Sequence, residues 1–210
     1  MDTTATRTNS RPGLALALLL VVAVIGAAIR FLPYSLGEQG NANFWAWNVT
    51  PVLAMMIFGV AQFRRVELGL LCPLSMLLAT DLALRLAGND PSSGWSRLPF
   101  YALFASLGLL GLVVKEKRTW PRLLGVCVAG PVGFFLISNF GVWLFADVLY
   151  GAPIYPKNLK GLLECYWNAL PFLRNDLIGT TLFLGGLFGS YAWLARRVPA
   201  MREADPALVG

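Results

Sequence analysis

Six stretches of this sequence are apolar over about the length of a membrane-crossing helix, and this feature limits the fold most. The stretches cover residues 13–32, 47–63, 66–88, 98–114, 123–150 and 171–194. A helix needs about 20 apolar residues to cross a hydrocarbon core about 30 Å thick. Because lipid offers the backbone no hydrogen bonds, such stretches must form helices or closed barrels. Their length and continuous apolarity predict an all-α, polytopic membrane helix bundle with about six transmembrane helices.

The composition supports this fold class and sets the domain organisation. Hydrophobic residues make up 57% of the 210 residues and charged residues only 13%, whereas soluble domains carry about 25% charged residues. Six spans and short loops use nearly the whole chain. We therefore expect a flexible cytoplasmic N-terminus over residues 1–12, a transmembrane domain over 13–195 and a cytoplasmic tail over 196–210.

The first apolar stretch has some features of a signal peptide. Arg7 and Arg11 precede it, as basic residues precede the apolar part of a secretory signal. However, Arg30 ends the stretch where a cleavage site would need small residues, and five more spans follow. We expect a retained membrane helix.

Basic residues cluster at the predicted helix ends and give the expected orientation. The formal net charge is +6, but these residues form no patch or arm, so we expect no nucleic-acid partner. Eleven of them fall on the side of the N-terminus and three on the opposite side. Cytoplasmic loops are enriched in Lys and Arg. We therefore expect both termini in the cytoplasm, as an even number of spans also requires.

The residue types that support most membrane chemistry are missing. The sequence has no histidine, and Cys72, Cys127 and Cys165 are widely spaced with no CxxC pair. Metal, haem and nucleophile–histidine sites are therefore not expected, and no nucleotide-binding phosphate loop is present. We expect no metal, no cofactor and no enzymatic activity. A membrane enzyme that uses Asp and Arg side chains is the least favoured alternative.

Polar residues within the spans gather at one depth, in the half that faces away from the cytoplasm. Asp81 and Arg85 are four residues apart and can pair on one helix face. Asn139, Trp143 and Asp147 form a second stripe with the same spacing. Charged groups inside a membrane are costly and usually face a cavity or a partner. We expect eight residues to bind a small polar or zwitterionic solute: Arg30, Asn48, Asp81, Arg85, Asn139, Trp143, Asp147 and Arg174.

Two alternatives stay open for these polar groups. They can pair with one another and only hold the helices together, as in a non-catalytic membrane scaffold or assembly protein. Those near the helix ends can also reach the membrane interface. The segment 150–168 is similarly open, because its apolar spacing fits either a short amphipathic helix on the outer surface or a lid over the site.

Three motifs carry a resemblance to a known family. They are Asn48-Val-Thr-Pro51-Val-Leu-Ala54, Ser138-Asn139-Phe-Gly-Val-Trp143 and Glu164-Cys165-Tyr166. The chain resembles an uncharacterised bacterial family of six-span membrane proteins. That family is distantly similar to the substrate-binding S components of energy-coupling-factor vitamin transporters.

The resemblance implies a location and a partner. It implies a multi-pass protein of the bacterial cytoplasmic membrane that binds a vitamin-like solute from the outer face. It also implies a coupling membrane protein with ATPase subunits. Such a protein would dock on small residues of the first helix, which here are Gly13 and Ala17 or Ala23 and Ala27.

Overall fold

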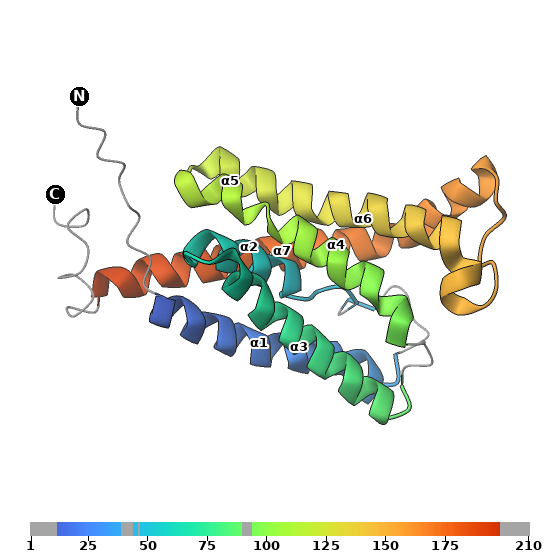
Figure 1. Cartoon of the computed structure of the whole chain (residues 1–210), viewed down its shortest axis with the longest axis horizontal. Coiled ribbons are helices and arrows are strands. Elements are labelled where there is room, and N and C mark those ends of the chain that lie inside the picture. The colour runs from blue at the N-terminus through green and yellow to red at the C-terminus, as the bar shows by residue number, and fades with distance from the viewer. Residues whose placement is uncertain (1–11, 39–43, 46, 90–93, 198–210) are drawn as a thin grey trace.

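The computed structural model describes residues 12–38, 44–45, 47–89 and 94–197, and over these residues the chain is helical without strands (Figure 1). The elements are α1 (Pro12–Ser35), α2 (Val52–Gln62), α3 (Val66–Leu86), η1 (Gly94–Arg97), α4 (Leu98–Gly108), α5 (Gly111–Glu116), α6 (Trp120–Tyr150) and α7 (Leu159–Arg197). The predicted all-α fold class is confirmed. The expectations for residues 1–11 and 198–210 lie outside the described residues.

Five helical segments are long and apolar enough to cross a membrane. They are Gly13–Ser35, Val66–Leu86, Leu98–Glu116, Trp120–Val148 and Leu159–Arg197. The third joins α4 and α5, because tight turns at Leu109 and Leu110 continue one helix into the other. Large apolar side chains on the outside of the bundle, such as Val24 and Leu182, are exposed. The surface therefore suits a lipid environment, as expected for a multi-pass membrane protein.

The second predicted span, over residues 47–63, is wrong in its first part. Only Val52–Gln62 is helical, and 11 residues extend about 16 Å, roughly half of the hydrocarbon core. Pro51 has no N–H to donate and disfavours a helical conformation at the residue before it. Asn48 has a φ of 59°, a left-handed conformation that Asn tolerates better than most residues. The backbone before α2 therefore cannot continue the helix.

This short helix lies at the centre of the bundle. Every residue of α2 is buried, and α2 contacts each of the other α-helices of the described chain. Each of these neighbours places a glycine against α2 or against the residues that lead into it: Gly26, Gly69, Gly108, Gly111, Gly130 and Gly179. Small residues let helix backbones approach closely where lipid gives no hydrophobic drive for association. The six helices thus surround α2 closely, and the glycines of α3, α5 and α7 meet the backbone of α2 or of the residues before it.

Basic side chains close the C-terminal end of α2. Lys115 donates from Nζ to the carbonyl oxygen of Phe63 at 2.8 Å, and Arg118 donates to Oε1 of Gln62 at 2.9 Å. The Arg118 guanidinium also lies over the ring of Phe188, and burial lowers the pKa of this guanidinium. Positive charge at a helix C-terminus complements the helix dipole. Lys115 and Arg118, which belong to the basic residues that predict the orientation in the membrane, thus also cap α2.

The last helix is longer than predicted. Helix α7 has 39 residues and extends about 58 Å, well beyond a hydrocarbon core. The predicted outer amphipathic helix is therefore not a separate element. From residue 159 onward it forms the first turns of α7. The start of α1 and the end of α7 lie at the same end of the molecule (Figure 1).

Candidate functional site

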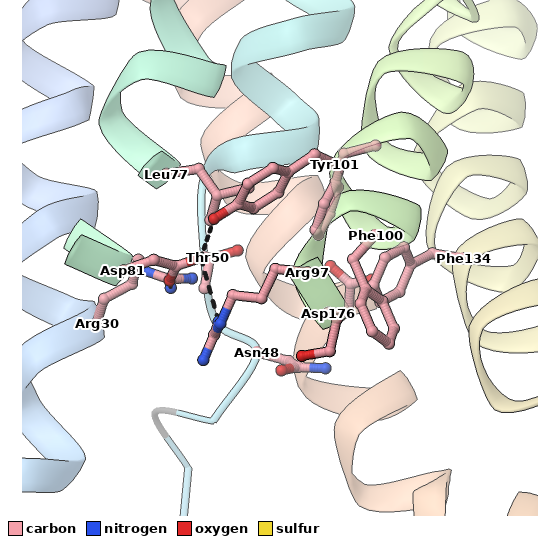
Figure 2. A pocket seen from close by; sticks show the side chains of 12 residues that line it. Arg30, Asn48, Thr50, Leu77, Asp81, Arg97, Phe100, Tyr101, Phe134 and Asp176 are labelled. Carbon is pink, nitrogen blue, oxygen red and sulfur yellow. Dashed lines mark hydrogen bonds and ion pairs between the residues drawn. The ribbon is translucent and has the colours of Figure 1, made fainter. Parts of the chain in front are cut away.

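A polar cavity lies inside the bundle, next to the start of α2 (Figure 2). Its volume is about 260 Å³. The side chains that line it come from α1, the residues before α2, α3, η1, α4, α6 and α7: Arg30, Asn48, Thr50, Leu77, Asp81, Ser96, Arg97, Phe100, Tyr101, Phe104, Phe134 and Asp176. The fold thus brings together polar residues that are far apart in the sequence.

Asp81 on α3 organises one side of this cavity. Its carboxylate forms ion pairs with Arg30 on α1 and with Arg97, whose Nη1 lies 3.1 Å from Oδ2. The hydroxyl of Tyr101 on α4 donates to the same Oδ2 at 2.6 Å. Asp81 is only 5% exposed, and a buried carboxylate needs such partners. Two guanidinium groups from different elements therefore share this one carboxylate.

Sequence reasoning missed Arg97 and Tyr101. In the sequence Arg97 precedes the predicted fourth span, which begins at residue 98, whereas in the structure it ends η1 and points into the cavity (Figure 2). Arg97 and Tyr101 are four residues apart, so at the start of a helix they share one face. This four-residue spacing, in a sequence that also places the carboxylate of Asp81 inside the membrane, could have indicated that Arg97 and Tyr101 contact Asp81.

Asp176 on α7 provides a second carboxylate. It is 6% exposed and accepts a hydrogen bond from Oγ1 of Thr180 at 3.3 Å. Among the described residues, no basic side chain lies within ion-pair distance of it. Asp176 is therefore a buried carboxyl group. If it is ionised, no cation among the described residues lies beside it.

The segment before α2 is fixed to α7. Asn175 donates from Nδ2 to the carbonyl oxygen of Trp47 at 2.9 Å. A Cβ atom on Gly179 would lie 3.2 Å from the Cα of Val49, so only a small residue allows this approach. The contacts place Asn48 and Thr50 in the cavity wall, directly at the N-terminus of α2, where the helix dipole is positive.

Aromatic rings form the remaining wall. Phe100, Tyr101 and Phe104 come from α4, and Phe134 comes from α6. The rings of Phe104 and Phe134 are stacked, with centroids 4.4 Å apart. The cavity therefore combines a charged side with a flat apolar side.

A smaller cavity of about 130 Å³ adjoins this one, since Asn48 and Asp176 line both. The eight predicted site residues divide between these cavities and the surface. Arg30, Asn48 and Asp81 line the main cavity, and Asn139 lines the smaller one.

Arg85 and Arg174 lie elsewhere. Both side chains are exposed, and Nε of Arg174 donates to Oδ1 of Asn175 at 3.3 Å. The predicted Asp81–Arg85 pair does not form, because Arg30 and Arg97 reach Asp81 across the bundle. Arg85 instead lies on the outer side of α3.

Two residues of the predicted stripe, Trp143 and Asp147, hold the connection between α6 and α7. The indole Nε1 of Trp143 donates to the carbonyl oxygen of Pro156 at 2.9 Å. Lys157 donates from Nζ to the carbonyl oxygen of Trp143 at 2.9 Å and pairs with Asp147 at 3.4 Å. Trp143 and Asp147 thus contact this connection rather than the main cavity.

The fold and the cavity together define a multi-pass membrane protein with a charged cavity inside its helix bundle. In the part of the chain that the structure describes, no group of three His, Cys, Asp or Glu side chains could hold a metal ion. The chain belongs to a family of unknown function, DUF6580, whose match covers residues 9–201. No curated protein and no solved structure matches the chain.

Proposed function

We propose that this protein binds a small polar solute in the main cavity and carries it across the bacterial cytoplasmic membrane. The observation that supports this proposal most is Asp176, a carboxylate that lines the cavity and has no basic partner among the residues that the structure describes. A group that only held helices together would have its partner within the chain, as Asp81 does. A ligand that enters the cavity is the natural partner for Asp176.

The interrupted second span supports transport rather than storage of the solute. Helices that break off near the membrane centre, with non-helical backbone beside a polar cavity, are typical of solute sites in transporters. Here the residues before α2 are that backbone, and Asn48 and Thr50 line the cavity. The proposed role is non-catalytic, with no cofactor.

The finer interpretation as an S-component-like protein rests on the sequence motifs. In that interpretation a coupling membrane protein with ATPase subunits supplies the energy. Gly13 and Ala17 on α1 are exposed, so they are accessible to such a partner. The vitamin-like nature of the solute belongs to the same interpretation and stays a prediction.

Thermal stability of the purified protein in detergent tests solute binding. A panel of amino acids, vitamins and nucleobases is added, and the melting temperature is measured. A solute that binds only the folded state, at a concentration of one hundred times its Kd, stabilises that state by about 2.7 kcal/mol. We expect Asp176→Asn to abolish the shift and Asp147→Asn, which changes an exposed carboxylate outside the cavity, to keep it. Equal shifts in both variants would contradict the proposal.

A membrane scaffold is the second candidate function. The observation that favours it is the closed set of contacts around Asp81, since Arg30, Arg97 and Tyr101 already satisfy that carboxylate. A scaffold predicts no stabilisation by any solute across a broad panel, together with a protein partner that remains bound during purification.

A further inference from the structure

Two carboxyl groups line the main cavity, and their surroundings differ. Asp81 pairs with two arginine side chains and accepts a hydrogen bond from the hydroxyl of Tyr101. Asp176 accepts one hydrogen bond, from Oγ1 of Thr180 to its Oδ1 at 3.3 Å. Within the described part of the chain, no group donates to its Oδ2. The fold therefore stabilises the ionised form of Asp81 much more than that of Asp176.

The elements around Asp176 bring few charged or titratable groups toward it. Four such groups share the main cavity with it: Arg30 on α1, Asp81 on α3, Arg97 at the end of η1 and Tyr101 on α4. Both arginines pair with Asp81, and neither lies within ion-pair distance of Asp176. The residues before α2 and helix α6 contribute only neutral side chains to the two cavities. On α7 itself, Arg174 is exposed and donates to Asn175.

Burial determines which form of this carboxyl group is stable. Asp176 is 6% exposed, and Thr180 beside it is fully buried. An isolated carboxylate is so costly in a medium of low dielectric constant that such a group takes up a proton instead. Acidic side chains inside membrane segments belong to proton pathways in many membrane proteins. In the conformation described here, the neutral acid is therefore the stable form of Asp176.

The main cavity gives a proton a route to this carboxyl group. Its volume of about 260 Å³ has room for several water molecules, since each occupies about 30 Å³ in the liquid. Arg97, which lines the same cavity, is 30% exposed. Figure 2 shows the carboxyl group of Asp176 and the side chains of Asn48 and Arg97 pointing toward one common space. Water in this space can accept the proton from Asp176 and return it.

We infer that Asp176 is a proton-binding site: its carboxyl group holds a proton in this conformation and exchanges that proton with water in the main cavity. The proton takes the place of a cation beside the carboxyl group. When the proton leaves, the α7 side of the cavity changes from neutral to negative. The charge of the cavity thus depends on the pH of the water that fills it. This inference goes beyond the proposed function, because it requires no solute.

Infrared spectroscopy of the purified protein in detergent tests the inference directly, with the proton itself as the probe. A protonated carboxyl group has a C=O stretching band that a carboxylate lacks. We expect the wild-type protein to show such a band at neutral pH, where an ordinary aspartate, with a pKa of about 4, is ionised. The band should disappear as the pH is raised toward about 9, and it should shift in deuterated water because the proton exchanges.

Variants assign the band to its residue. Asp176→Asn should abolish the band, because an amide has no acid proton. Asp147→Asn is the matched control and should leave the band unchanged, since Asp147 is exposed and pairs with Lys157. Thr180→Val keeps the carboxyl group and removes its hydrogen-bond donor, which also stabilises the ionised form. The band should then persist to a higher pH than in the wild-type protein. This variant decides the assignment if Asp176→Asn does not fold.

The melting temperature gives a second, independent measurement. An unfolded chain ionises an aspartate above about pH 4, whereas the folded protein keeps the proton on Asp176 to a higher pH. The folded state then binds one proton more than the unfolded state, so its stability falls as the pH rises. Asp176→Asn cannot ionise. The melting temperature of the wild-type protein minus that of this variant should therefore decrease between about pH 5 and about pH 9.

Three results would overturn the inference. They are a carboxyl band that is identical in the wild-type protein and Asp176→Asn at every pH, a band that neither responds to pH nor shifts in deuterated water, and a difference in melting temperature that does not fall with pH. Solute binding in the main cavity would still stand in each case. Conversely, failure of every solute in the panel would overturn the proposed function and leave the proton site in place.

Discussion

Gly59 of α2 and Gly69 of α3 lie in direct backbone contact: a Cβ atom on Gly59 would stand 2.6 Å from the carbonyl oxygen of Gly69 and 2.7 Å from its Cα. Real Cβ atoms do not approach other atoms so closely, and backbone has little freedom to move away. The distance between α2 and α3 therefore depends on glycine at this position.

We expect Gly59→Ala to lower the stability of the folded protein by about 1–3 kcal/mol, the usual cost of an overpacked interior. Gly125→Ala is the matched control, because nothing lies within 4 Å of a Cβ at that helical position. Melting temperatures in the same detergent compare the two variants. Similar melting temperatures for both would show that α2 and α3 do not have this spacing.

The network around Asp81 gives the second prediction. Asp81→Asn keeps the volume but removes the carboxylate that Arg30 and Arg97 share. The loss of one partner from a buried ion pair costs about 3–5 kcal/mol, so a large fall in melting temperature is expected. The double variant Asp81→Asn with Arg30→Gln should recover part of the loss, because one unpaired charge is removed. A double variant that is less stable than Asp81→Asn would contradict this account.

The connection between α6 and α7 gives the third prediction. Lys157→Met removes the hydrogen bonds to the carbonyl oxygens of Trp143 and Leu144 and the ion pair with Asp147. Limited proteolysis should then cut residues 151–158 faster than in the wild-type protein. Lys160→Met is the control, since that lysine is 85% exposed and its ion pair with Glu164, at 3.9 Å, lies within α7. Equal cutting rates would mean that Lys157 does not hold the connection.

The orientation in the membrane gives the fourth prediction. With Cys72, Cys127 and Cys165 replaced by serine, one new cysteine is introduced at Asn89 or at Lys117, which lie in connections after α3 and after α5. A membrane-impermeant maleimide added to intact spheroplasts should label Asn89→Cys and not Lys117→Cys, as cytoplasmic ends require. The reverse labelling pattern would place the ends outside.

Sequence patterns predicted the helical class and most helix positions, because span length and apolarity follow directly from the thickness of a bilayer. The second predicted span is the exception, because only its part from Val52 to Gln62 is helical. Residues 47–51 bring the apolar run of residues 52–63 to the length of a span, but Pro51 and the left-handed Asn48 prevent a helix there. Hydropathy reports the environment of a residue and not its backbone conformation.

The candidate site was predicted in part for a related reason. Depth in the membrane can be read from the position of a residue within its span. On that ground the sequence grouped Arg30, Asn48 and Asp81, and these three residues line one cavity. Which helix faces which is a property of tertiary contacts. The sequence therefore suggested Arg85 as the partner of Asp81, whereas Arg30 and Arg97 come from other elements.

The position of α2 also determines the order in which the bundle can assemble. A helix of 11 residues with non-helical backbone before it has no stable position in lipid by itself. It needs the flanking helices α1 and α3 as partners before it can leave the insertion machinery. The first three helices should therefore enter the bilayer as one cooperative unit. A nascent chain that ends after α2 should remain accessible from the aqueous side until α3 has been made.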